Sequence, residues 1–174
     1  MTLDRRPSKT IELPQEVEAV LREFRTCEMS TLARDGAPIT WPTLPFWRPE
    51  EARFLITTSI GLPHKAFNVR RNPRVSLLFS GPTASGLADP PAVLVQGDAE
   101  APDEVTTSIE GFENELRLVF SRQPASGLYS GNPITRYLFD WYYMRLQIHV
   151  TPSRILWWPR GDFGQLPREV GRVG

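Results

Sequence analysis

The stretch FLITTSIGLPHKAFNVRRNPRVSLLFS, residues 54–80, decides the fold and gives the first indication of a site. Its pattern predicts a strand, a loop, a short helix over 63–72 and a second strand. Pro63 suits the first position of a helix, and Pro73 prevents the helix from continuing. From residue 52 to residue 88 the chain carries five Lys and Arg residues and no Asp or Glu. This surplus is either a solvated basic face or a site for an anion.

The composition is that of a single globular domain. The chain has 174 residues, of which 40% are hydrophobic and 23% charged, and its net charge is zero. Zero net charge argues against general binding to nucleic acid or to an anionic membrane. No apolar run approaches the ~18 residues of a membrane span, and the first ten residues lack the apolar core of a secretory signal. We therefore expect a cytoplasmic protein with no nucleic-acid or membrane partner.

The thiol and imidazole groups of the sequence offer no metal site. Cys27 is the single cysteine, which excludes an intrachain disulfide and a cysteine-based metal cluster. It begins an apolar alternation, and this favours a buried structural thiol over a reactive one. His64 and His149 are the two histidines, and they fit no metal-ligand spacing. We expect no bound metal.

The N-terminal third predicts an arm, a helix and three strands. Residues 1–13 form a loose arm, and apolar residues at helical spacing predict an amphipathic helix from Pro14 to Arg25. Three strands joined as a meander follow, at 27–33, 38–47 and 53–58. Asp35-Gly36 is a hairpin turn between the first two. Pro42 and Pro45 place the second strand at an edge or at bulges, because proline lacks the N–H that a sheet needs.

After residue 80 the pattern predicts more strands and two long loops. The Gly- and Pro-rich loop at 81–91 suggests a flap, and Gly97 suggests a bulge or a close backbone approach. The other predicted elements are a strand at 92–101, a helix at 108–122, a loop at 123–135, and strands at 137–150 and 154–158. A polar tail at 161–174 should be exposed. About six or seven antiparallel strands with short helices indicate a mainly β fold, a small closed or split β-barrel over 14–160.

The end of the strand before the helix carries the groups that a phosphate monoester requires, a positive charge and several hydrogen-bond donors. Thr57 and Thr58 supply hydroxyls, and the turn before Pro63 offers backbone N–H groups near a helix N-terminus. His64 and Lys65 fall in the first helical turn, where cations oppose the helix dipole unless an anion lies nearby. The alternative is that Lys65 is a solvated surface lysine.

Other residues favour a structural role or leave two roles open. Arg70 and Arg71 lie in the last helical turn, where cations suit the helix dipole, so a structural role is favoured. Gln96, in an otherwise apolar strand, can hydrogen-bond a heterocycle or face solvent. The chain lacks the G-x-S-x-G, H-E-x-x-H and phosphate-loop motifs, and no carboxylate pair stands out. An enzyme without such groups must import its chemistry, as a redox cofactor does.

Several segments in order resemble the pyridoxamine 5′-phosphate oxidase-like family of the flavin-binding split β-barrel superfamily. They are Met29–Ala33 with Asp35–Pro38, Thr57 through Lys65 to Asn72–Leu77, Val93–Glu100, and Thr151–Pro159. The resemblance covers roughly residues 15–160. It implies a homodimer with a cofactor in each of two clefts at the interface. The family mostly binds FMN, while some branches bind the deazaflavin coenzyme F420, and some bind haem or no known cofactor.

The resemblance also implies cofactor-binding residues. Lys65 and Thr57 would contact the flavin phosphate, and the strand around Trp41 would lie along the isoalloxazine edge through its backbone groups. The Arg-x-x-Leu-Lys pattern of the oxidases is missing from that strand, and His64 stands where they carry an Arg. The resemblance therefore does not extend to pyridoxamine phosphate oxidation. The candidate cofactor-binding residues are Trp41, Pro42, Thr43, Thr57, Thr58, His64, Lys65 and Gln96.

Three functions are compatible with this resemblance. The first is an FMN-dependent oxidoreductase with a small-molecule redox substrate, in which the protein positions the cofactor. The second is an F420-dependent reductase, whose longer anionic tail would use Arg70, Arg71 or Arg74 beyond Lys65. The third is a non-enzymatic flavin or haem binder.

Overall fold

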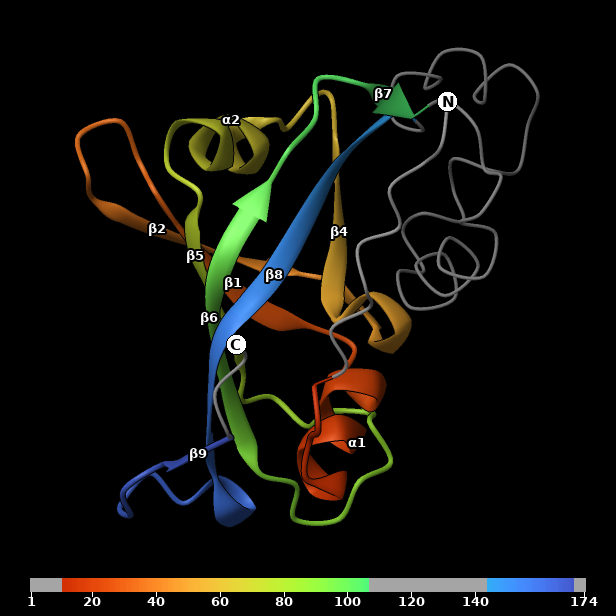
Figure 1. The fold of residues 1–174 in the computed structure, drawn as a ribbon, viewed down its shortest axis with the longest axis vertical. Coiled ribbons are helices and arrows are strands. Elements are labelled where there is room, and N and C mark those ends of the chain that lie inside the picture. Colours follow the sequence, from red (N-terminus) through yellow and green to blue (C-terminus); the bar gives the residue numbers. More distant parts are fainter. Residues whose placement is uncertain (1–10, 107–143, 171–174) are drawn as a thin grey trace.

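The computed structural model describes residues 11–106 and 144–170, which form one curled antiparallel sheet with two α-helices (Figure 1). Seven strands follow one path, in the order β2-β1-β5-β6-β8-β4-β3, and the short strands β7 and β9 both pair with β8. The elements are α1 (Gln15–Glu23), β1 (Cys27–Leu32), β2 (Pro38–Thr43), β3 (Pro45–Arg48), η1 (Pro49–Glu51), β4 (Arg53–Ser59), α2 (His64–Arg71), β5 (Arg74–Phe79), β6 (Ala92–Glu100), β7 (Val105–Thr106), β8 (Arg145–Trp158), η3 (Pro159–Gly161) and β9 (Arg168–Glu169).

The sheet must curl because its two outermost strands are consecutive in the chain. Strand β2 ends at Thr43 and β3 begins at Pro45, so only Leu44 separates the two edges. Two residues of chain span at most about 7 Å, whereas seven strands laid flat at about 4.8 Å spacing would hold the edges about 29 Å apart. The path therefore bends back on itself. This is the split β-barrel that the sequence predicts.

Alternating side chains fill the inside of the curl, and the two helices lie at its opposite ends (Figure 1). The rings of Phe54 and Phe79 are 5.8 Å apart between centroids, and Trp47 lies 4.7 Å from Phe54. The buried face of α1 consists of Val17, Val20 and Leu21, as the amphipathic pattern predicted. Across the described residues, no helix has the length and apolar character that a membrane span requires.

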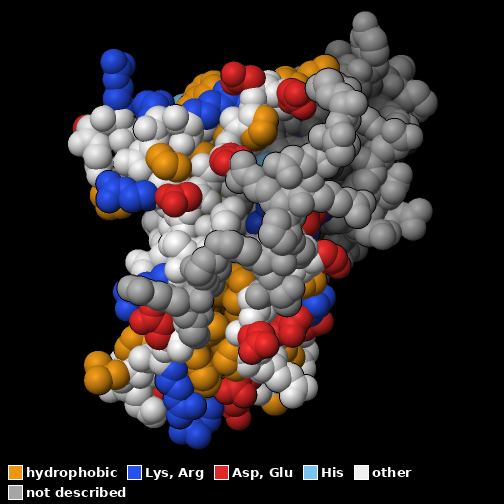
Figure 2. All heavy atoms as spheres, in the orientation of Figure 1, with side chains coloured by type: hydrophobic (Ala, Val, Ile, Leu, Met, Phe, Trp, Pro, Cys, Tyr) orange, Lys and Arg blue, Asp and Glu red, His pale blue; other side chains and the backbone are white. Residues whose placement is uncertain are grey.

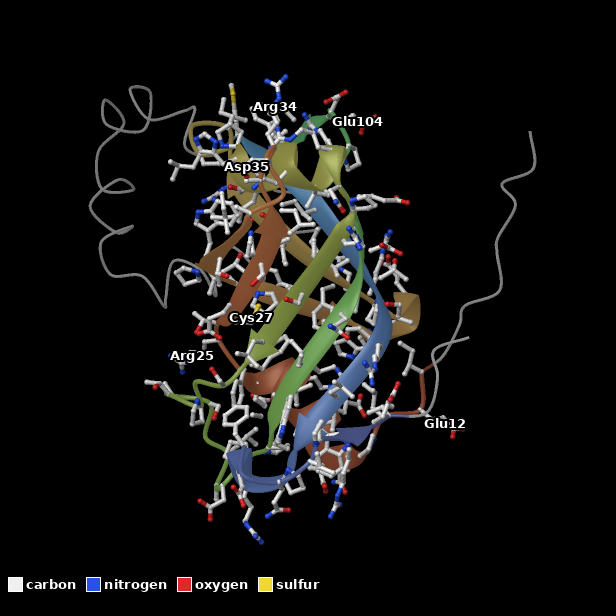
Figure 3. All side chains as sticks on the ribbon, turned by 90° about the vertical axis from the view of Figure 1, so that its left-hand side faces the viewer. Glu12, Arg25, Cys27, Arg34, Asp35 and Glu104 are labelled. Atoms are coloured by element: carbon white, nitrogen blue, oxygen red, sulfur yellow. The ribbon has the colours of Figure 1, made fainter. Side chains whose placement is uncertain are left out.

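Cys27 begins β1 and lies inside the curled sheet (Figure 3). Its side chain is buried, and burial raises the pKa of the thiol, with a smaller contribution from the neighbouring charge of Glu28. The thiolate is the reactive form of cysteine, so a raised pKa keeps this group inert. The interpretation of Cys27 as a structural thiol is confirmed.

Two strand predictions are wrong at their boundaries. The predicted strand 38–47 is two strands, since β2 pairs with β1 and β3 pairs with β4. The predicted strands 137–150 and 154–158 are joined instead, as β8 runs from Arg145 to Trp158 without a break. A proline inside β8, Pro152, is tolerated because the pairing with β6 shifts register opposite it.

Two further expectations concern the C-terminal part. The tail is not wholly exposed, because β9 pairs with β8 and Val170 is buried. Trp158 and Phe163 also contact each other, at 5.2 Å between ring centroids. The helix expected at 108–122, the loop at 123–135 and the first part of the strand at 137–150 lie outside the described residues.

The bulge at Gly97 has a steric cause. The pairing of β6 with β8 shifts register between Gln96 and Gly97, as the sequence predicted for this glycine. A Cβ atom built at Gly97 would lie 2.2 Å from the carbonyl oxygen of Thr151 and 3.1 Å from Cα of Pro152. Both are backbone atoms, so a side chain here forces the two strands apart.

We expect Gly97→Ala to lower the free energy of unfolding by about 1–3 kcal/mol, because the new methyl group overlaps the backbone of β8. Urea denaturation followed by circular dichroism measures this loss. Gly81→Ala is the matched control, since a Cβ atom at Gly81 meets nothing within 4 Å. Equal stability of the two variants would contradict the steric account.

A buried hydrogen bond docks α2 onto β1. The amide Nδ2 of Asn68 donates to the hydroxyl of Thr31 at 3.0 Å, and both side chains are buried. The carbonyl oxygen of the Asn68 amide accepts a hydrogen bond from Arg71. This bond therefore helps to fix the position of α2, together with the buried side chains of Ala66 and Val69.

We expect Thr31→Val to destabilise the protein by about 1–3 kcal/mol, because the isosteric side chain leaves the buried Asn68 amide without its acceptor. The measurement is again urea denaturation, and Thr31→Ser serves as a control that keeps the hydroxyl. A Thr31→Val protein as stable as the wild type would show that the bond does not hold α2 in place.

Candidate functional site

The hydroxyl groups at the end of β4 have different uses. Thr58 is buried and donates its hydroxyl to the carbonyl oxygen of Leu62 at 2.9 Å. The hydroxyl of Ser59 accepts a hydrogen bond from the N–H of Gly61 at 3.2 Å. These bonds hold the turn between β4 and α2. Thr57 is half-buried on the face of β4 opposite to that of Thr58, and its hydroxyl has no hydrogen-bond partner among the described residues. Of the two predicted threonines, Thr57 is thus the one with a donor left for a ligand.

Lys65 lies in the first turn of α2 and is half-buried. It makes no ion pair with any residue that the structure describes. Its Nζ atom lies over the ring of Trp41, 5.7 Å from the centroid. Burial lowers the pKa of Lys65, and the charge of Arg145 lowers it further. A half-buried ammonium group beside a second cation is unfavourable by itself and becomes favourable when an anion binds between them.

Arg145 is a cation of this site that sequence reasoning missed. Strands β4 and β8 pair with Ser59 opposite Arg145 and Thr57 opposite Gln147, so these four residues share one face of the sheet. In the sequence, Arg145 is only one polar position of an alternating strand. Its approach to Lys65 follows from the register between β4 and β8, which no local pattern reveals.

The structure places the other predicted site residues differently. Pro42 and His64 are exposed, and Thr43 is buried opposite Cys27. Gln96 is exposed on β6 and pairs with Arg154 of β8. Arg154 lies nine residues beyond Arg145, so about 30 Å of strand separates Gln96 from the Arg145 end of β8. Of the two roles left open for Gln96, the structure of one chain shows the solvent-facing one.

Of the predicted residues, the structure places Trp41 against Lys65 and Lys65 near Arg145. Thr57 lies on the same sheet face as Arg145, opposite Gln147. Lys and Arg side chains gather over α2 and the tip of the β1–β2 hairpin (Figure 2). The tip residues Arg34 and Asp35 lie at this same end of the molecule (Figure 3).

The arginines at the end of α2 bond within the protein. Arg70 donates to the carbonyl oxygens of Ala101 and Pro102, each at 2.7 Å, and pairs with Asp103 at 2.7 Å. Arg71 donates to the amide oxygen of Asn68. The structural role predicted for both arginines is confirmed. The contacts of Arg70 dock the helix against residues 101–103, which follow β6, whereas that of Arg71 lies within α2.

The groups that meet at this site fit a phosphate. An ammonium group, a guanidinium group and a hydroxyl are all donors, and the first N–H groups of α2 have no partner within the helix. Among the described residues no group of three or more His, Cys, Asp or Glu side chains is arranged to hold a metal ion. The donor set is thus one for an anion.

Solved structures share this fold. An F420 reductase superposes with a TM-score of 0.54 at 20% identity, over 82% of this chain and 98% of its own. A haem-binding protein from Mycobacterium smegmatis gives 0.52 at 16% identity, over 91% of this chain and 59% of its own. A protein from Clostridium acetobutylicum related to general stress protein 26, of the pyridoxinephosphate oxidase family, gives 0.55 at 10% identity, over 91% and 95%. Identities this low establish the fold alone.

Sequence comparison gives the family. Among curated proteins no match was found. The sequence model of the family described as pyridoxamine 5′-phosphate oxidase matches residues 13–115, which is more than half of the chain. The match spans both α-helices and most of the strands of the curled sheet. The chain therefore belongs to the pyridoxamine 5′-phosphate oxidase family.

Proposed function

We propose that this protein binds FMN and uses it in an oxidoreductase reaction with a small-molecule redox substrate. The observation that carries the proposal is that Lys65 is half-buried near Arg145, while Lys65 itself has no acidic partner among the described residues. A phosphate monoester carries close to two negative charges at neutral pH and thus matches two cations. The Thr57 hydroxyl and the N-terminus of α2 supply further donors.

The protein's own part in this function is binding and orientation. Lys65 and Arg145 hold the phosphate through charge-assisted hydrogen bonds, and Thr57 adds a neutral one. The flavin, when bound, supplies the redox chemistry by taking a hydride. Fixing the tail of the cofactor at one end of the curled sheet limits how its ring can lie against the strands.

An F420-dependent reductase is the second candidate, and a structural neighbour is an F420 reductase. The longer anionic tail of F420 would need cations along α2 beyond Lys65. Arg70 and Arg71 bond within the protein, and of the three candidates only the exposed Arg74 is left for such a tail. This supports FMN over F420. A haem binder would show a Soret band, whereas bound FMN absorbs near 450 nm.

We also propose a homodimer that holds one cofactor in each of two clefts between the subunits. The proposal follows from membership of the pyridoxamine 5′-phosphate oxidase family. The candidate phosphate-binding residues of one chain lie at one end of its sheet. Light scattering on the purified protein should give twice the mass of the chain. A mass equal to one chain with FMN bound would contradict the shared cleft.

We expect Lys65→Gln and Arg145→Gln each to weaken FMN binding by about tenfold or more, because each removes one charge-assisted bond to the phosphate. Isothermal titration of FMN measures the change. Riboflavin, which lacks the phosphate, should bind both variants and the wild type alike. Arg74→Gln is the control, because Arg74 is an exposed cation outside the site. A wild-type protein that fails to bind FMN at tens of micromolar would overturn the proposed function.

The affinity for FMN should fall as the pH rises, and this fall should begin below pH 10.5, the ordinary pKa of a lysine. Burial and Arg145 lower the pKa of Lys65, so the ammonium group loses its proton, and the phosphate loses its partner, before a solvated lysine would. The measurement is the ratio of FMN to riboflavin affinity between pH 7 and 10, which cancels changes in the flavin ring itself. Lys65→Arg should remove the decline, since guanidinium stays charged throughout.

A further inference from the structure

The side chain of Trp41 contacts Lys65, which is separate from the backbone contact with the flavin ring expected for this strand. We propose that Trp41 is a positioning residue, whose indole ring holds the Lys65 ammonium group in place beside Arg145 so that it is ready to receive the phosphate. This inference rests on the proposed function and assigns a residue within its site. Trp41 acts through Lys65 and need not touch the anion.

The geometry ties the ring and the ammonium group to the same pair of strands. Trp41 lies opposite Met29 in the β1–β2 hairpin, and the Nζ atom of Lys65 lies 5.7 Å from the ring centroid. Helix α2 is held on β1 through the bond between Asn68 and Thr31, two residues beyond Met29. The backbone of Lys65 and the ring of Trp41 are therefore both fixed relative to β1.

The ring offsets the two effects that act against a charge at Lys65. Partial burial and the nearby Arg145 cation both disfavour the ammonium form, whereas the negative face of an indole ring favours it. The ring also restricts a side chain whose rotamer freedom is otherwise large. An ammonium group has three N–H donors, so one directed at the ring leaves two for an anion.

The composition of the chain makes this inference easy to test. Of its 20 basic residues only Lys9 and Lys65 are lysines, and the rest are arginines. A protein labelled with ¹³C at the lysine ε carbons therefore gives two side-chain signals by NMR. Lys65→Arg removes one signal and so assigns the other to Lys9, which then serves as an internal reference.

The first measurement needs no ligand. Protons above an aromatic ring shift upfield, so the ε-methylene protons of Lys65 should resonate upfield of those of Lys9 in the wild type. The shift should disappear in Trp41→Leu and persist in Trp41→Phe, which keeps a ring. The pKa of Lys65 should fall further in Trp41→Leu, while Arg145, the charged group that faces Lys65 from β8, is unchanged. Coincident lysine signals in the wild type, or a pKa that is unchanged or raised in Trp41→Leu, would overturn the inference.

The second measurement uses FMN. We expect Trp41→Leu to weaken FMN binding about fivefold, the effect of losing a partly desolvated cation–π contact, and Trp41→Phe to recover most of it. Equal FMN affinity of Trp41→Leu and the wild type would overturn the inference while leaving the proposed function intact. An upfield Lys65 signal in a wild type that binds no FMN would instead refute the proposed function and leave the contact between Trp41 and Lys65 established.

Discussion

The architecture depends on one short link, the single residue Leu44 between the two edge strands of the sheet. Because β2 and β3 must meet there, the sheet curls, and strands far apart in hydrogen-bond order become neighbours at its end. Pro45 pairs with Ile56, so the chain just before Pro45 runs toward the Thr57 end of β4. The link thus brings the strand that carries Trp41 toward the site, although β2 and β4 lie five places apart along the path.

Local patterns predicted much of this fold because they report on burial and turns. The strand, turn, helix and strand of residues 54–80 follow from apolar alternation and two prolines, and the structure reproduces them. Gly97 was recognisable as a bulge, but its partner Pro152 was not. A proline in a long strand looks like a break when the register shift opposite it cannot be seen. This is why the sequence predicts two strands, 137–150 and 154–158, where the structure has the single strand β8.

Only those residues of the candidate site that lie close together in the chain could be predicted from the sequence. Thr57 and Lys65 follow from a strand end and a helix start, which are close in the chain. Arg145 lies 80 residues beyond Lys65 and joins it through strand pairing, which is a long-range property. The number of Lys and Arg residues between 52 and 88 also does not show which of them belong to the site. Arg70 and Arg71 prove to be bonded to the backbone or side chains of their own domain, whereas Lys65 lacks an acidic partner in the described parts of the chain.

Because of the contacts of Arg70, the short segment from Ala101 to Thr106 connects the two elements that carry the cations of the candidate site. At its start, the segment is bonded to α2 through Arg70, and at its end Thr106 pairs with Arg145 on β8. Lys65 and Arg145 stand on separate elements, α2 and β8, yet both elements are bonded to this one stretch of backbone. The stretch is therefore one connection between the two elements, in addition to the packing of α2 on β1 and the pairing of β8 with β4. If the segment detached at either end, Lys65 and Arg145 would lose one of the connections that fix their separation.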